Sequence, residues 1–170
     1  MGREQAEEIV HAAVVVGEAL AAGRQVFAFG NGGSATDAQH FAAELVGRFV
    51  RPRRALPVLA LSADSAVLTS VGNDLGFDQL FARQIEALGR PGDVALGMTT
   101  SGVSANVNVA LTQARALGLQ TIALTGRDGG EAGRLVDVHI NVPAAETPRI
   151  QEVHRVVLHV ICELVERRIG

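Results

Sequence analysis

The sequence predicts an α/β fold with a parallel sheet that helices cover on both faces. Short apolar runs recur along the chain with helical segments between them, and each run ends in Gly, Ser, Thr or Asn. The runs are nearly continuous and rich in Val, Leu, Ile and Ala, as is typical of strands that are buried on both faces. At 170 residues the chain suits one domain.

The first half of the chain provides four expected elements in order. An Ala-rich stretch over residues 3–22 predicts a helix, and the apolar run at 25–29 predicts the first strand. A second helix is expected over 34–48, because Ser34 can cap the free amide groups at its start. The run LPVLALS at 56–62 predicts the second strand.

The middle of the chain continues the alternation of helix and strand. Helical segments are expected over 64–71 and 77–88. The run DVALGMT at 93–99 predicts the third strand, and another helix is expected over 103–116.

The C-terminal part adds two strands and a long amphipathic helix. The runs LQTIALTG at 119–126 and VDVHINV at 136–142 predict the fourth and fifth strands. The last helix is expected over 147–168, and Pro148 suits its first turn. The chain is therefore expected to form one domain over 1–170, with an N-terminal helix (3–22), an αβ core (25–142) and a C-terminal helix (147–168).

Composition argues against several classes of protein. The net charge is −3 and the only basic tract is the short RPRR at 51–54, so nucleic-acid binding is not expected. The N-terminus is acidic, and no segment reaches the ~18 uninterrupted apolar residues of a membrane span. Cys162, the single cysteine, lies in an apolar helical run where a buried, unreactive thiol is expected. These features predict a cytoplasmic protein that does not bind membranes.

A glycine-rich loop follows the first strand. Ligands of such sheets bind beyond the carboxyl ends of the strands, at a topological switch point, which directs attention to the loops after the first and third strands. The sequence GNGGSA at 30–35 matches a dinucleotide-binding fingerprint, but the acidic residue that should follow about twenty positions later is missing, because Val50 stands there. A simple tight turn would explain the glycines but not the neighbouring Asn31 and Ser34.

The loop after the third strand is rich in hydroxyl groups. In TTSGVSAN at 99–106, four hydroxyls and a glycine stand where a helix begins, so side chains, amides and the helix dipole can converge on one anion. The loop contains no Lys or Arg, which argues against a Walker-type nucleotide site and favours a sugar phosphate. The alternative is helix capping by Ser101 or Ser104, for which a single hydroxyl would suffice.

Two helices carry candidate metal ligands or proton-transfer groups. His40 and Glu44 are four residues apart, so their side chains share one face of a helix, although such pairs are also common on solvated faces. The C-terminal helix offers Gln151 and His159, which are separated by roughly 12 Å of helix rise. A single metal bound by both would need a distorted first turn or a residue from a neighbouring subunit. In isolation, His159 between Leu158 and Val160 is of a kind that is more often a core histidine than a ligand.

Taken together, the motifs resemble a known family. The segments GNGGSATDAQHFAAEL, VGNDLGF, GMTTSGVSANV, ALTGRDGG and RIQEVH…H follow one another in the order found in phosphoheptose isomerases, members of the sugar isomerase (SIS) domain superfamily. The resemblance implies a flavodoxin-like, three-layer αβα sandwich and a homotetramer with active sites between subunits. It also implies conversion of sedoheptulose 7-phosphate to D-glycero-D-manno-heptose 7-phosphate, the first step of ADP- or GDP-heptose precursor synthesis.

The resemblance also implies roles for individual residues. The catalytic base and acid correspond to Glu44 and His159, and one zinc ion per subunit would be held by His40, Glu44, Gln151 and His159. Substrate contacts correspond to Asn31, Gly32, Gly33, Ser34, Glu44, Asn73, Asp74 and Gln151, and the phosphate would be held by Thr99, Thr100, Ser101 and Ser104. The chain departs from the family at Val103, where members often have Asn, and at Pro148, where some have an acidic residue.

The chemistry of these residue types is coherent. Moving a carbonyl between C1 and C2 needs a base for a carbon-bound proton, an acid for the oxygen and an electrophile for the enediolate. Two alternatives remain: an isomerase of another sugar phosphate, and a non-catalytic SIS protein that binds the bacterial replication initiator. The second lacks counterparts of Glu44 and His159, and both residues are present here.

Overall fold

A five-stranded parallel sheet forms the centre of the molecule. The structure is a computed structural model that describes residues 3–170. The strands are β1 (Val26–Gly30), β2 (Val58–Ala60), β3 (Val94–Thr99), β4 (Gln120–Gly126) and β5 (Val138–Val142), in the order β2-β1-β3-β4-β5. All pairs are parallel, which confirms the predicted sheet, and the order is that of flavodoxin-like folds.

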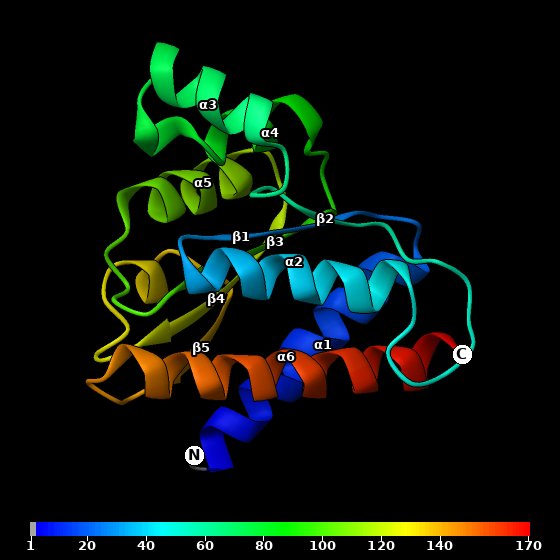
Figure 1. The fold of residues 1–170 in the computed structure, drawn as a ribbon. Helices are drawn as coiled ribbons and strands as arrows, with labels where there is room; N and C mark the ends of the chain where they lie inside the picture. Colours follow the sequence, from blue (N-terminus) through cyan, green and yellow to red (C-terminus); the bar gives the residue numbers. More distant parts are fainter. Residues whose placement is uncertain (1–2) are drawn as a thin grey trace.

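Within residues 3–170, six α-helices cover the two faces of this sheet, giving the predicted three layers. They are α1 (Arg3–Ala21), α2 (Gly33–Val46), α3 (Ser65–Asp74), α4 (Ala82–Leu88), α5 (Ala105–Ala116) and α6 (Thr147–Ile169), with short 3-10 turns η1 (Phe77–Gln79) and η2 (Ala132–Arg134). Helices α1, α2 and α6 lie on one face, and α3, α4 and α5 lie on the other (Figure 1). Among residues 3–170, no helix is long and apolar enough to cross a membrane.

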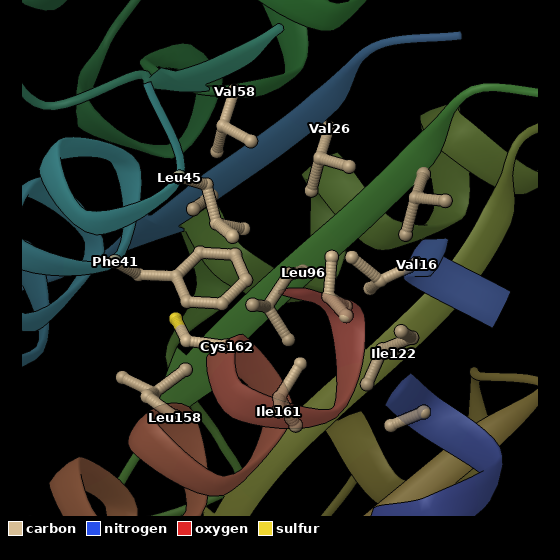
Figure 2. Close-up of a cluster of buried hydrophobic side chains, with 14 of the residues drawn as sticks. Val16, Val26, Phe41, Leu45, Val58, Leu96, Ile122, Leu158, Ile161 and Cys162 are labelled. Carbon is tan, nitrogen blue, oxygen red and sulfur yellow. The ribbon is translucent and has the colours of Figure 1, made fainter. Parts of the chain in front are cut away.

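The side chains of each strand alternate between two apolar cores, because successive residues of a strand point to opposite faces. Val26 and Leu96 face α1, α2 and α6, whereas Phe27 and Ala95 face α4 and α5. Figure 2 shows the first core, in which side chains from α2 and α6 meet over the sheet.

Cys162 belongs to this first core. Its side chain is buried among those of α2 and α6 (Figure 2), as predicted. Burial, together with the charges of Glu44 and Glu166, raises the pKa of its thiol to about 12, so the group stays protonated and unreactive at neutral pH.

The second strand is shorter than predicted. Its pairing with β1 starts at Val58 and not at residue 56. The backbone amide of Leu56 donates to the carbonyl oxygen of Leu45 at the end of α2, and the amide of Val58 donates to the carbonyl oxygen of Leu56. As an edge strand, β2 pairs with β1 alone, through three residues.

Several helix boundaries also differ from the predictions. Gly32 occupies the N-cap position of α2, so Ser34 lies inside the helix and is not its cap. Asp64 caps α3 by accepting from the amides of Ala66 and Val67, and the helix continues to Asp74. The segment 77–88 breaks into η1 and α4 because the side chains of Leu80 and Phe81 point into the core that faces α4 and α5. There the ring centroids of Phe81 and Phe29 lie 5.4 Å apart.

Candidate active site

The loops after β1 and β3 lie side by side at the switch point of the sheet. The chain runs from β1 outward to β2 and then returns to β3, so the carboxyl ends of β1 and β3 are neighbours. The amide side chains of Asn31 and Asn106 exchange two hydrogen bonds of 2.8 Å and join the two loops. Asn106 is the last residue of the TTSGVSAN segment, and it was not among the predicted site residues. The sequence does show an asparagine near the start of each of the two helices, α2 and α5, and this pattern could have indicated the contact.

The glycines of the first loop leave room for the backbone and for a neighbouring side chain. Gly32 has a φ of 56°, a left-handed conformation that glycine adopts without strain. A Cβ atom at Gly33 would lie 2.9 Å from Cδ of Gln151, so the glycine leaves room for the end of this α6 side chain to pack against the start of α2. The loop thereby brings Gln151 next to Asn31 and Ser34, as lining of one small cavity.

The hydroxyl groups of the second loop bond to one another. The hydroxyl of Thr99 lies 2.9 Å from that of Ser104 and 3.3 Å from that of Ser101, and it accepts from the amide of Gly102. Ser104 stands at the N-cap position of α5, but its hydroxyl bonds Thr99 in place of the helix amides. Capping therefore does not account for this group of hydroxyls.

These two loops and the start of α6 surround a cavity of about 250 Å³. The residues that line it are Asn31, Gly32, Gly33, Ser34, Met98, Thr99, Thr100, Ser104, Thr147 and Gln151. The structure thus gathers most of the residues predicted to contact the substrate or its phosphate. Asn73 and Asp74 lie elsewhere, at the exposed C-terminal end of α3, where their side chains bond each other at 2.7 Å.

A second cavity, of about 490 Å³, extends along α6 from the first. Gly33 and Gln151 line both cavities, and His159 lines the second, two turns further along the helix. Gln151 and His159 of one chain therefore face a common space. The carboxylate of Asp37 lies in the wall of this cavity and accepts two hydrogen bonds from Arg155, at 2.6 and 3.1 Å. This ion pair joins α2 and α6, and no pattern in the sequence predicted it.

His40, Glu44 and His159 converge on one point within a single chain. Nε2 of His40 lies 3.0 Å from Nε2 of His159 and 3.2 Å from Oε1 of Glu44, and the three possible ligand atoms all lie within 4.8 Å of one another. Two imidazole nitrogens and a carboxylate oxygen are a donor set that suits zinc and leaves coordination positions open. The residues present therefore fit a catalytic zinc ion.

The two histidines of α6 have different environments. His154 is the core histidine: it is fully buried, and its Nε2 lies 2.9 Å from the carbonyl oxygen of Thr125. Burial lowers the pKa of His154, so this side chain is neutral at pH 7. His159 is half-buried and points toward α2, where it meets His40.

Comparison with known proteins places these features in context. Residues 1–126 match the SIS domain family. The chain is 53% identical to a phosphoheptose isomerase of Geobacter sulfurreducens, with 98% of this chain and 88% of that protein covered. It is 54% identical to a phosphoheptose isomerase of Aquifex aeolicus, with 96% and 86% covered.

Solved structures agree with this match. The fold superimposes on a phosphoheptose isomerase from Neisseria gonorrhoeae with a TM-score of 0.90 and 45% identity, over 95% of this chain and 86% of that chain. For a phosphoheptose isomerase from Francisella tularensis the TM-score is 0.92 and the identity 38%, over 96% and 90% of the two chains.

Proposed function

We infer the activity of this chain from its membership of a family: it belongs to the phosphoheptose isomerases, which are SIS domain proteins. It is an aldose–ketose isomerase that converts sedoheptulose 7-phosphate to D-glycero-D-manno-heptose 7-phosphate in heptose precursor synthesis. The observation that carries the chemical proposal below is the convergence of His40, Glu44 and His159 beside a hydroxyl-lined cavity.

The two adjoining cavities suggest how the substrate lies. Its phosphate is on C7, and the reacting carbons are C1 and C2, at the opposite end of the molecule. We place the phosphate among Thr99, Thr100, Ser101 and Ser104, and the reacting carbons beside Glu44 and His159. The sugar chain then passes Gly33 and Gln151, which line both cavities.

The reaction is a proton transfer through an enediol or enediolate. The Glu44 carboxylate takes a proton from C1 and His159 delivers a proton to the C2 oxygen; protonated Glu44 then gives its proton to C2 and His159 takes the proton of the C1 hydroxyl, which leaves the aldose and restores both residues. His40, Glu44 and His159, which converge within one chain, would hold one zinc ion per chain. Gln151 would be the fourth ligand from a neighbouring subunit, because within one chain it lies roughly 12 Å from His159 along α6. When bound, zinc supplies Lewis-acid stabilisation of the negative charge that develops on the substrate oxygens. Asn31, Gly32, Gly33 and Ser34 contact and orient the sugar.

We also propose a cytoplasmic homotetramer with active sites between subunits. Val156 and Val160 flank His159 on α6 and are 61% and 38% exposed, an apolar surface that a neighbouring subunit would cover. In such an assembly Asn73 and Asp74, which are exposed in the single chain, would contact the sugar from an adjacent subunit.

The activity is tested by incubating the purified protein with sedoheptulose 7-phosphate and following the sugar by NMR. We expect the signals of an aldoheptose 7-phosphate to appear and to depend on enzyme concentration. Turnover of a different sugar phosphate alone would favour another SIS isomerase. Absence of turnover with every sugar phosphate, in protein shown to be folded and loaded with zinc, would favour a binding protein.

The phosphate assignment makes a separate prediction. Replacing both Ser101 and Ser104 with Ala should weaken binding of sedoheptulose 7-phosphate by about tenfold or more, because it removes two hydroxyl groups that donate hydrogen bonds to the charged phosphate. Binding of free sedoheptulose, measured alongside by calorimetry, should change little. Thr112→Ala is a matched control, since it removes a hydroxyl of α5 that bonds the carbonyl of Asn108. Equal losses for the two sugars would contradict the assignment.

A further inference from the structure

The ring of His159 contacts two other rings. Its centroid lies 5.2 Å from that of His40 and 5.3 Å from that of Phe49, at interplanar angles of 42° and 39°. Phe49 belongs to the irregular segment between α2 and β2. The orientation of the His159 ring therefore depends on how firmly this segment is held.

Glu166 of α6 holds the segment through its backbone. The carboxylate accepts hydrogen bonds from three successive amides, those of Phe49 at 2.8 Å and of Val50 and Arg51 at 2.9 Å. Glu166 is only 1% exposed. Burial raises the pKa of this carboxyl, but the three amides and Arg53 outweigh that effect and hold the pKa below its ordinary value. Glu166 is therefore ionised at neutral pH.

Arg53 completes the anchor from the other side. Its Nε lies 3.1 Å from Oε1 of Glu166, and the Arg53 side chain is 2% exposed. Its guanidinium donates to the carbonyl oxygens of Glu44 at 2.8 Å and Gly47 at 3.1 Å, which a helix leaves without partners at its C-terminal end. The same ion pair thus fixes the end of α2, which carries Glu44, and the segment that carries Phe49.

Glu166 and His159 are seven residues apart on α6, so they lie on one face, two turns from each other. A buried ion pair adds little net stability compared with apolar side chains, but it defines a geometry sharply and is costly to break. We propose that Glu166 and Arg53 are positioning residues, which set the orientation of His159 through Phe49. This inference rests on the proposed function, because it assigns His159 to zinc binding and proton transfer.

Two variants test the path from the ion pair to the histidine. Phe49→Leu keeps an apolar side chain but removes the ring, and Glu166→Gln removes the charge that organises the segment. In both we expect the dissociation constant of zinc, measured by competition with a chromophoric chelator, to rise about 10- to 100-fold. At saturating zinc, kcat should fall while KM changes little. Glu163→Gln is the matched control, because Glu163 lies on the same helix in an exposed pair with Arg167.

The double variant separates positioning from mere destabilisation. If both residues act through one path, Phe49→Leu combined with Glu166→Gln should lose no more zinc affinity than Glu166→Gln alone. Wild-type zinc affinity and kcat in Phe49→Leu would overturn the inference, and so would additive losses in the double variant. If Glu166→Gln does not fold, Phe49→Leu decides the question by itself. Should the wild-type enzyme work without zinc, the metal assignment fails, and the kcat of Phe49→Leu still tests positioning.

Discussion

Replacing Glu44 with Gln is expected to lower kcat by about 10² to 10⁴, because an amide cannot accept the carbon-bound proton. The fold should survive, since the Glu44 side chain is 25% exposed and the hydrogen bond from Arg53 goes to its backbone carbonyl. The measurement is steady-state turnover of sedoheptulose 7-phosphate, with circular dichroism to show that the variant is folded.

The same variant separates the two roles assigned to Glu44. Loss of turnover with zinc retained would assign the carboxylate to proton transfer, whereas loss of both would assign it to metal binding as well. Glu86→Gln is a suitable control, because Glu86 is an exposed carboxylate on α4 that pairs with Arg83. Near-normal turnover by folded, zinc-loaded Glu44→Gln would refute the base assignment.

The second large effect should come from the metal site. We expect about one zinc per chain in protein purified without chelator, and loss of both metal and activity in His40→Ala and His159→Ala. Each variant removes one of the two imidazole nitrogens that lie 3.0 Å apart, and a zinc site with fewer protein ligands holds its metal weakly. Elemental analysis measures the stoichiometry, and zinc added to stripped wild-type enzyme should restore turnover.

A histidine outside the site provides the control. His11 lies on α1, where it is exposed and pairs with Glu8, so His11→Ala should keep both zinc and activity. Full activity of a rigorously metal-free wild-type preparation would refute the zinc role and leave Glu44 and His159 as an unaided acid and base pair.

Local patterns were sufficient to predict most of the fold. Five apolar runs predicted five parallel strands, and the residues at their ends predicted the two loops that line the small cavity. The errors lie where a neighbouring element competes with local preference. The amide of Leu56 donates to the carbonyl oxygen of Leu45 and not to a neighbouring strand, and burial of Leu80 and Phe81 breaks an expected helix.

The sequence by itself determined the α/β class, the two ligand loops and the pairing of His40 with Glu44 on one helical face, because each depends on residues that are close in the chain. Spacing alone did not predict that His159, and not His154, reaches that pair; the family resemblance implied it, and the tertiary structure shows it. Only the tertiary structure decided that Glu166 organises the segment carrying Phe49. These contacts join residues more than a hundred positions apart, and they depend on how α6 packs against α2, which no local period encodes.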